Sequence, residues 1–110
     1  MRRAAIPLAG ALALLPALDA APVLARDVQV ERGRSLASTR CARCHAVGGT
    51  GASPMGQAPP FRTLHERYPV EYLAEALTEG IRTGHPSMPE FRFDPDEAEA
   101  LIAYLRTLGR

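Results

Sequence analysis

The sequence predicts a small all-α domain, and three observations support this fold class. Three segments carry apolar residues three or four positions apart, which is the spacing of one buried helix face. Stretches rich in Gly and Pro, which are typical of loops, separate these segments. No segment alternates apolar and polar residues as a half-buried strand does. The chain has 110 residues, so it holds at most one domain.

The first two elements are predicted to be a helix and a long loop. An apolar stripe at helical spacing predicts a helix that ends near Arg40; the stripe is formed by Val30, Gly33, Leu36 and Ala37. Residues 46–60 follow, and their Gly and Pro content predicts a loop. A short helical turn is expected next, holding Phe61 and Leu64.

Two further helices are predicted in the second half of the chain. Pro69 suits a first helical position, and the stripe behind it consists of Val70, Leu73, Ala74, Leu77 and Ile81. Gly80, Gly84 and Pro86 are expected to end this helix. The last helix should start at Asp94, with Pro95 in its first turn and Glu97 placed for a capping box. Its buried face is expected to consist of Ala98, Leu101, Ile102, Leu105 and Leu108, with Tyr104 beside it.

The first 25 residues have the pattern of a secretory signal. Two arginines precede an apolar run from Ala4 to Leu18, and small residues near Ala25 suit cleavage after that position. Cleavage after Ala20 or Ala21 is the weaker option, and an uncleaved membrane anchor is the rival interpretation. We therefore expect a signal peptide at residues 1–25, a domain at residues 26–110 and a periplasmic location, with membrane anchoring if the signal is retained.

The motif with the clearest chemistry is Cys41-Ala42-Arg43-Cys44-His45. Two thiols three residues apart can each add to a vinyl group of one haem, and the adjacent histidine can bind its iron. A zinc site could use the same residues with His65 or His85 as fourth ligand, but adjacent ligands suit zinc poorly. A thioredoxin-like pair would need the motif between a strand and a helix. The motif therefore predicts one covalent haem c, with Cys41 and Cys44 as thioethers and His45 as iron ligand.

A second iron ligand is expected at Met88. Its thioether favours reduced iron, and prolines on both sides stiffen the segment Gly84-His85-Pro86-Ser87-Met88-Pro89. His85 could replace Met88 if the methionine left the iron. We expect His65 to face solvent, and we expect Met55 to pack within the loop because it lies too close to His45 along the chain.

Together these residues resemble a small bacterial class I cytochrome c. The resemblance covers about Val28 to Leu108, and its marks are Gly33, the haem motif, Pro59-Pro60-Phe61, Met88-Pro89-Glu90-Phe91 and Leu101-Ile102-Ala103-Tyr104-Leu105. It implies the cytochrome c fold, in which three main helices and short turns surround the haem. It implies that the first and last helices cross where Gly33 admits Tyr104. Where this family often has an aromatic residue the chain has Ala37, so we expect a less tightly filled crossing.

The resemblance also implies how the proximal histidine is held. In the family a proline carbonyl accepts a hydrogen bond from this imidazole, and Pro59 is the best match, with Pro60 as the alternative. Arg82 could pair with a haem propionate. The predicted haem pocket is apolar and consists of Leu36, Phe61, Leu64, Leu73, Leu77, Ile81, Phe91, Leu101 and Leu105.

The implied function is one-electron transfer between redox proteins, without catalysis. Arginines (13, with no lysine) nearly balance 12 acids, which argues against nucleic acid as partner. Charge is uneven along the chain: residues 26–43 hold five arginines and two acids, and residues 90–99 hold five acids and one arginine. Arg40 and Arg43 could steer an acidic partner to the haem edge, or the charges could simply be solvated. We expect a monomer or a subunit of a redox complex. The alternatives to a free carrier are a cytochrome subunit of a dehydrogenase or oxidase complex and a haem sensor or peroxidase-like protein with an open iron site.

Overall fold

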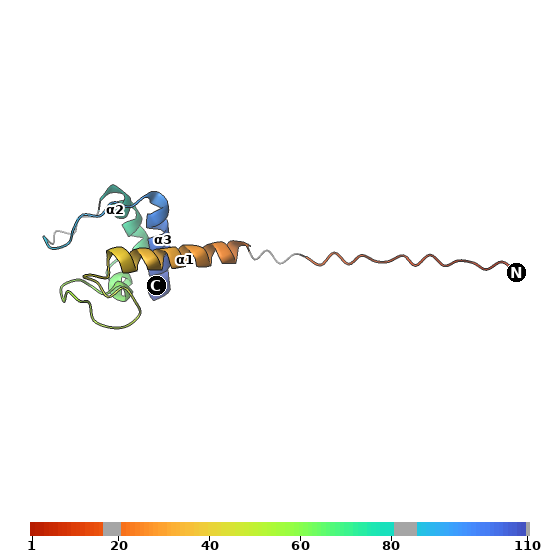
Figure 1. The fold of residues 1–110 in the computed structure, drawn as a ribbon, viewed down its shortest axis with the longest axis horizontal. Coiled ribbons are helices and arrows are strands. Elements are labelled where there is room, and N and C mark those ends of the chain that lie inside the picture. Colours follow the sequence, from red (N-terminus) through yellow and green to blue (C-terminus); the bar gives the residue numbers. More distant parts are fainter. Residues whose placement is uncertain (17–20, 81–85, 110) are drawn as a thin grey trace.

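The chain forms a helical domain preceded by an extended segment (Figure 1). The computed structural model describes residues 1–16, 21–80 and 86–109. Its elements, in chain order, are α1 (Ala21–Arg40), the 3₁₀ helices η1 (Phe61–Glu66) and η2 (Val70–Tyr72), α2 (Leu73–Glu79) and α3 (Pro95–Leu108). These described ranges contain no strand, so the prediction of an all-α fold is confirmed.

The crossing of α1 and α3 is the centre of the fold (Figure 1). Gly33 lies at the point of closest approach, where a Cβ atom would be 2.6 Å from the Ala100 carbonyl carbon and 2.8 Å from Tyr104 Cβ. Tyr104 is 2% exposed, and Ala37 is fully buried. The predicted approach of Tyr104 to Gly33 is therefore present, and Ala37 is closed off from solvent although it is small.

Opposite charges meet across this crossing. Arg32 pairs with Asp96 at 3.8 Å and Arg40 with Glu97 at 3.3 Å. The Arg40 guanidinium also lies 5.0 Å from the centroid of the Phe93 ring. The arginine-rich and acid-rich stretches of the sequence thus partly neutralise each other within the molecule.

The start of α3 is fixed by local chemistry. Asp94 and Glu97 form a capping box: the Asp94 side chain accepts a hydrogen bond from the Glu97 N–H, and the Glu97 side chain accepts one from the Asp94 N–H. Pro95 occupies the first helical position, where its missing N–H costs nothing. The predicted helix start is confirmed.

The helix predicted from Pro69 to Ile81 is shorter and less regular than expected. It begins as η2, continues as α2 and ends at Glu79, because Gly80 adopts a φ of 109° that stops the helix. The Gly80 N–H still donates to the Ala76 carbonyl, at 3.0 Å. Ile81 lies outside the described residues.

The N-terminal part of the chain lies apart from the helical domain. Residues 1–16 have no helix and are exposed, extending away from the domain (Figure 1). Helix α1 begins at Ala21 and so runs through position 25, where cleavage is predicted. Its first turns carry the exposed apolar side chains of Val23, Leu24 and Val28. Among the described residues, no helix combines the length and the hydropathy needed to cross a membrane.

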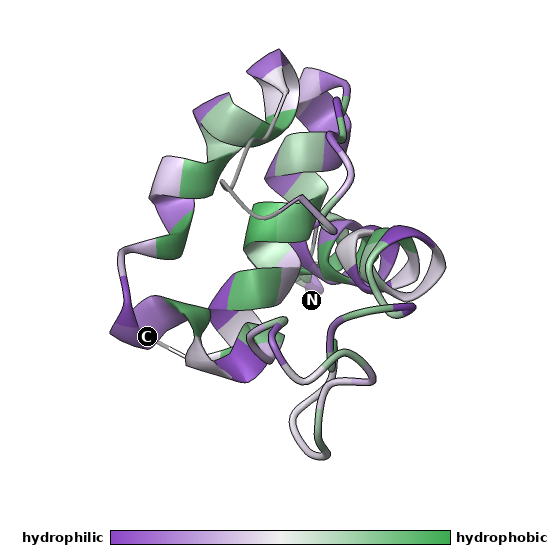
Figure 2. Cartoon of the chain, turned by 90° about the vertical axis from the view of Figure 1, so that its left-hand side faces the viewer, coloured by the Kyte–Doolittle hydropathy of each residue, from purple (hydrophilic) through white to green (hydrophobic). Residues whose placement is uncertain are grey.

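Buried apolar side chains from all five helical elements form one core cluster, and hydrophobic stretches of the chain gather in the middle of the domain (Figure 2). The large buried side chains are Phe61, Leu64, Val70, Leu77, Phe93, Leu101, Ile102, Tyr104 and Leu105. Five residues of the predicted pocket belong to this set, and three are only half-buried: Leu36, Leu73 and Phe91. The sequence analysis missed Phe93, which lies in a non-helical segment where its N–H donates to the Leu77 carbonyl at 2.8 Å.

Candidate functional site

The motif Cys41–His45 lies in a tight turn directly after α1. The Cys41 N–H donates to the Ala37 carbonyl at 2.9 Å, so the last helical turn leads into the motif. The Cys41 carbonyl then accepts two hydrogen bonds, from Cys44 N–H at 3.2 Å and His45 N–H at 2.9 Å. This single turn brings both thiols and the imidazole together, as attachment to one planar ring requires.

Both cysteines are half-buried free thiols. Burial raises the pKa of the Cys41 thiol to about 11, and the neighbouring Arg40 guanidinium lowers it by a smaller amount. The Cys41 thiol is therefore neutral at physiological pH.

The His45 ring is held from one side. Its Nδ1 atom lies 2.8 Å from the Pro59 carbonyl oxygen, which can only accept, so Nδ1 carries a proton and, in the neutral imidazole, Nε2 is the nitrogen without one. The Phe61 ring packs against the imidazole with 5.1 Å between centroids. The contact involves Pro59 rather than Pro60, and it presents Nε2 as the atom able to bind a metal.

Hydrogen bonds fold residues 46–60 back onto the motif. The Met55 N–H donates to the Cys44 carbonyl at 3.0 Å, and the Tyr104 hydroxyl donates to the Val47 carbonyl at 2.5 Å. Arg62 donates to the Gly51 carbonyl at 2.7 Å. The loop that carries Pro59 is thus anchored to the motif, to η1 and to α3. The Tyr104 hydroxyl bond is one that the sequence did not indicate.

The structure describes only some of the other residues that the sequence analysis considered for the haem site. Met88 is half-buried in the turn before Phe91, and Met55 is half-buried in the loop, as expected for packing. His85 and Arg82 lie outside the described residues. Among those described, no cluster of three His, Cys, Asp or Glu side chains could hold a metal ion.

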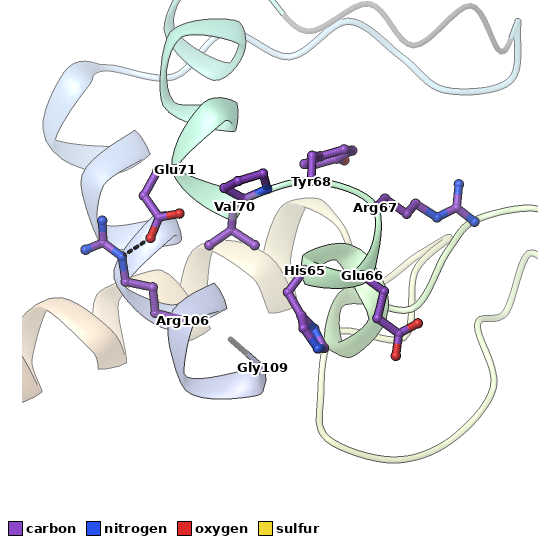
Figure 3. A pocket seen from close by; sticks show the side chains of 9 residues that line it. His65, Glu66, Arg67, Tyr68, Val70, Glu71, Arg106 and Gly109 are labelled. Carbon is purple, nitrogen blue, oxygen red and sulfur yellow. Dashed lines mark hydrogen bonds and ion pairs between the residues drawn. The ribbon is translucent and has the colours of Figure 1, made fainter.

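The prediction that His65 faces solvent is only partly right, because the residue is half-buried. Its Nδ1 atom is buried, has no hydrogen-bond partner and lies against Gly109 at the end of α3. This ring borders an open pocket of about 610 Å³ that also contains the Glu71–Arg106 ion pair, at 2.8 Å (Figure 3). None of the haem-motif residues lines this pocket, so it is separate from the site built on His45.

The residues around the motif fit a haem. The motif supplies two thiols and an imidazole whose Nδ1 atom bonds the Pro59 carbonyl, and the half-buried thioether of Met88 lies in the segment before α3. The half-buried leucines and Phe91 supply apolar surface that the protein's own core leaves incompletely covered. The site therefore defines a class of protein: a helical c-type haem protein.

The chain belongs to the cytochrome c family, whose profile matches residues 30–109. It is similar to cytochrome c6 from Bryopsis maxima, with 30% identity over 83 residues that cover 69% of this chain and 88% of the relative. It is also similar to a cytochrome c-553-like protein from Synechocystis sp. (strain ATCC 27184 / PCC 6803 / Kazusa), with 29% identity over 86 residues, 78% of this chain and 75% of the relative. No solved structure matches the chain significantly. The predicted family is confirmed: the protein carries one covalent c-type haem and transfers electrons, and it is not an enzyme.

Proposed function

We propose that the chain carries single electrons between redox proteins on a haem held by Cys41 and Cys44 and ligated by His45 and Met88. The observation that carries this proposal is the 2.8 Å contact between His45 Nδ1 and the Pro59 carbonyl. It fixes the tautomer and the ring orientation before any iron binds, so Nε2 is presented as a ligand. A His/Met haem supplies a one-electron Fe(III)/Fe(II) couple with a raised potential.

The chain's residues have separate parts in this proposal. The Pro59 carbonyl accepts a hydrogen bond from His45 Nδ1–H and Phe61 packs against the same ring, so the imidazole keeps its orientation when the iron changes oxidation state. The apolar residues exclude water, which is a second means of setting the potential. Arg82 is proposed as a partner of a haem propionate.

The ligand assignment is tested by comparing two methionine substitutions. The chain is expressed in a bacterium able to attach haem, and spectra of the oxidised and reduced protein are recorded. Met88→Ala should abolish the weak ferric band of Met–iron coordination and lower the reduction potential, whereas the matched control Met55→Ala should leave both unchanged. An unchanged spectrum in Met88→Ala would overturn the assignment, and rapid carbon monoxide binding by the native reduced protein would favour an open iron site.

We propose that the protein works in the periplasm after removal of residues 1–25. The proposal rests on the signal-like composition of that segment and on the separation of residues 1–16 from the helical domain. The intact mass of the haem protein recovered from the periplasm should correspond to a chain that starts at Arg26. A chain that starts at Met1 would refute cleavage, and recovery with the membrane fraction would favour an anchor.

A further inference from the structure

The chain is tied to the end of α2 shortly after Met88. The Arg92 guanidinium donates to the Glu79 carbonyl at 3.0 Å, and the Phe93 N–H donates to the Leu77 carbonyl at 2.8 Å. Both carbonyls belong to the last turn of α2, where a helix has no backbone donors of its own to offer. The segment that follows Met88 thus caps the helix that precedes it.

These contacts hold the chain on α2 at a point next to Met88. Glu90 lies against Gly80, because a Cβ atom added at Gly80 would be 3.3 Å from the carboxyl carbon of Glu90. Along the sequence, Met88 comes directly before Pro89, and Glu90 and Arg92 follow within the next few positions. The position of the Met88 backbone therefore depends on how firmly the following residues are held on α2.

The two hydrogen bonds differ in how easily they can open. Phe93 is 4% exposed and belongs to the core, so its backbone bond is protected from water. Arg92 is exposed, and its bond to the Glu79 carbonyl competes with water. The helix dipole favours a positive charge at this end of α2, which stabilises the closed arrangement. The Arg92 bond is therefore the contact that can open while the core stays intact.

We propose that Arg92 is a positioning residue for Met88, and that its bond to the Glu79 carbonyl limits how often the thioether leaves the haem iron. While Arg92 is bonded, the segment stays on α2 and the methionine stays in place. When the bond opens, the segment gains conformational freedom, and the open state of the sixth position becomes more populated. This inference rests on the proposed ligation by Met88 and adds the residue that regulates it.

The test measures carbon monoxide binding to the reduced haem protein. Carbon monoxide binds only at an open sixth position, so at high concentration its rate reaches a limit that equals the rate at which Met88 leaves. Arg92→Leu removes the donor but keeps part of the apolar stem, and it should raise this limiting rate about three- to tenfold. Arg92→Lys keeps a donor and the positive charge, so its limiting rate should be close to the native one.

Arg62→Leu is the matched control for Arg92→Leu. Arg62 also donates to a backbone carbonyl, that of Gly51 at 2.7 Å, but this bond ties the loop at residues 46–60 and not the segment of Met88. Both variants should lose a similar unfolding free energy, because each loses a hydrogen bond from arginine to the backbone. Only Arg92→Leu should raise the limiting rate. Equal increases in the two variants would show that any loss of stability frees Met88, and would overturn the specific role of Arg92.

Imidazole binding to the oxidised protein gives an independent equilibrium measurement. Imidazole competes with Met88 for the iron and is uncharged, so the lost charge of Arg92→Leu does not itself change its affinity. It should bind about three- to tenfold more tightly to Arg92→Leu than to the native protein.

A limiting rate and an imidazole affinity equal to the native values in Arg92→Leu would overturn the inference. Failure of the proposed ligation is distinguishable from this result. If Met88 is not the ligand, Met88→Ala keeps the native spectrum. If only the role of Arg92 fails, the native protein binds carbon monoxide slowly and with a limiting rate, and Arg92→Leu leaves that rate unchanged.

Discussion

Replacing Gly33 with alanine tests whether the crossing of α1 and α3 determines the stability of the domain. The new methyl carbon would lie 2.6 Å from the Ala100 carbonyl carbon and 2.8 Å from Tyr104 Cβ, and closer still to the Ala100 carbonyl oxygen. Carbon atoms pack best at about 3.5–4.0 Å, so α3 would have to move by about 1 Å. Backbone atoms cannot rotate aside as a flexible side chain can.

The size of the effect follows from two opposing contributions. Overpacking of a tight core costs about 1–3 kcal/mol, and we expect the upper end because the obstacle is backbone. Alanine regains about 1 kcal/mol of helix propensity relative to glycine. The net loss should be about 2 kcal/mol, which for a domain of this size lowers the Tm by about 8–16 °C.

The assay is thermal and guanidinium unfolding of the haem-loaded protein, with Gly49→Ala as the control. A Cβ atom at Gly49 meets nothing within 4 Å, so this variant should stay within about 0.5 kcal/mol of the native protein. A Gly33→Ala protein as stable as the native one, or more stable, would refute the argument that the helices are in backbone contact at this point.

Three further predictions concern single contacts. Tyr104→Phe should cost about 1–2 kcal/mol, because it leaves the buried hydroxyl's acceptor, the Val47 carbonyl, without its 2.5 Å partner. Asp94→Ala should cost about 1 kcal/mol by removing half of the capping box of α3. The hydrogen bond from Arg106 lowers the pKa of Glu71 below 4.5. The native protein should therefore be more stable to unfolding than Glu71→Gln above pH 4.5, and this difference should vanish as the pH falls through the lowered pKa. Each is measured by chemical unfolding of the haem protein, the last one as a pH series.

Each of these measurements has a control that separates the named contact from a general disturbance. Tyr68→Phe, at an exposed tyrosine, should be nearly neutral, and a Tyr104→Phe cost no larger than this would contradict the hydroxyl's role. Asp96→Ala keeps the cap and should cost less than Asp94→Ala, whereas equal costs would argue against the capping box. High salt should shrink the Glu71 difference at pH 7, since the pair is exposed, and a difference that grew at acid pH would contradict the sign.

Features encoded within a few residues could be predicted from the sequence. The capping box needs only Asp94, Pro95 and Glu97, and the attachment motif needs one turn of chain. The contact between α1 and α3 at Gly33 and Tyr104 was predicted from the family resemblance alone. The two residues are 71 positions apart, and the periodicity of each helix does not say which other helix it packs against. The structure places both residues at that crossing.

Features that depend on distant segments were predicted less well. His65 is half-buried, and its buried Nδ1 atom lies against Gly109, 44 positions later in the chain, so the local sequence around His65 gave no signal of this contact. Phe93 is buried by contact with α2 although its own segment has no helical period. Helix α2 ends early because Gly80 has a positive φ. The sequence offered three residues that could end this helix, Gly80, Gly84 and Pro86, and did not show which of them does.

The two charge-biased stretches have one consequence that only the folded chain reveals. Arg32 and Arg40 are paired with Asp96 and Glu97, so these groups cannot also provide the net charge that attracts a partner from a distance. Salt should therefore weaken the helix crossing slightly, by the roughly 0–1 kcal/mol typical of exposed pairs.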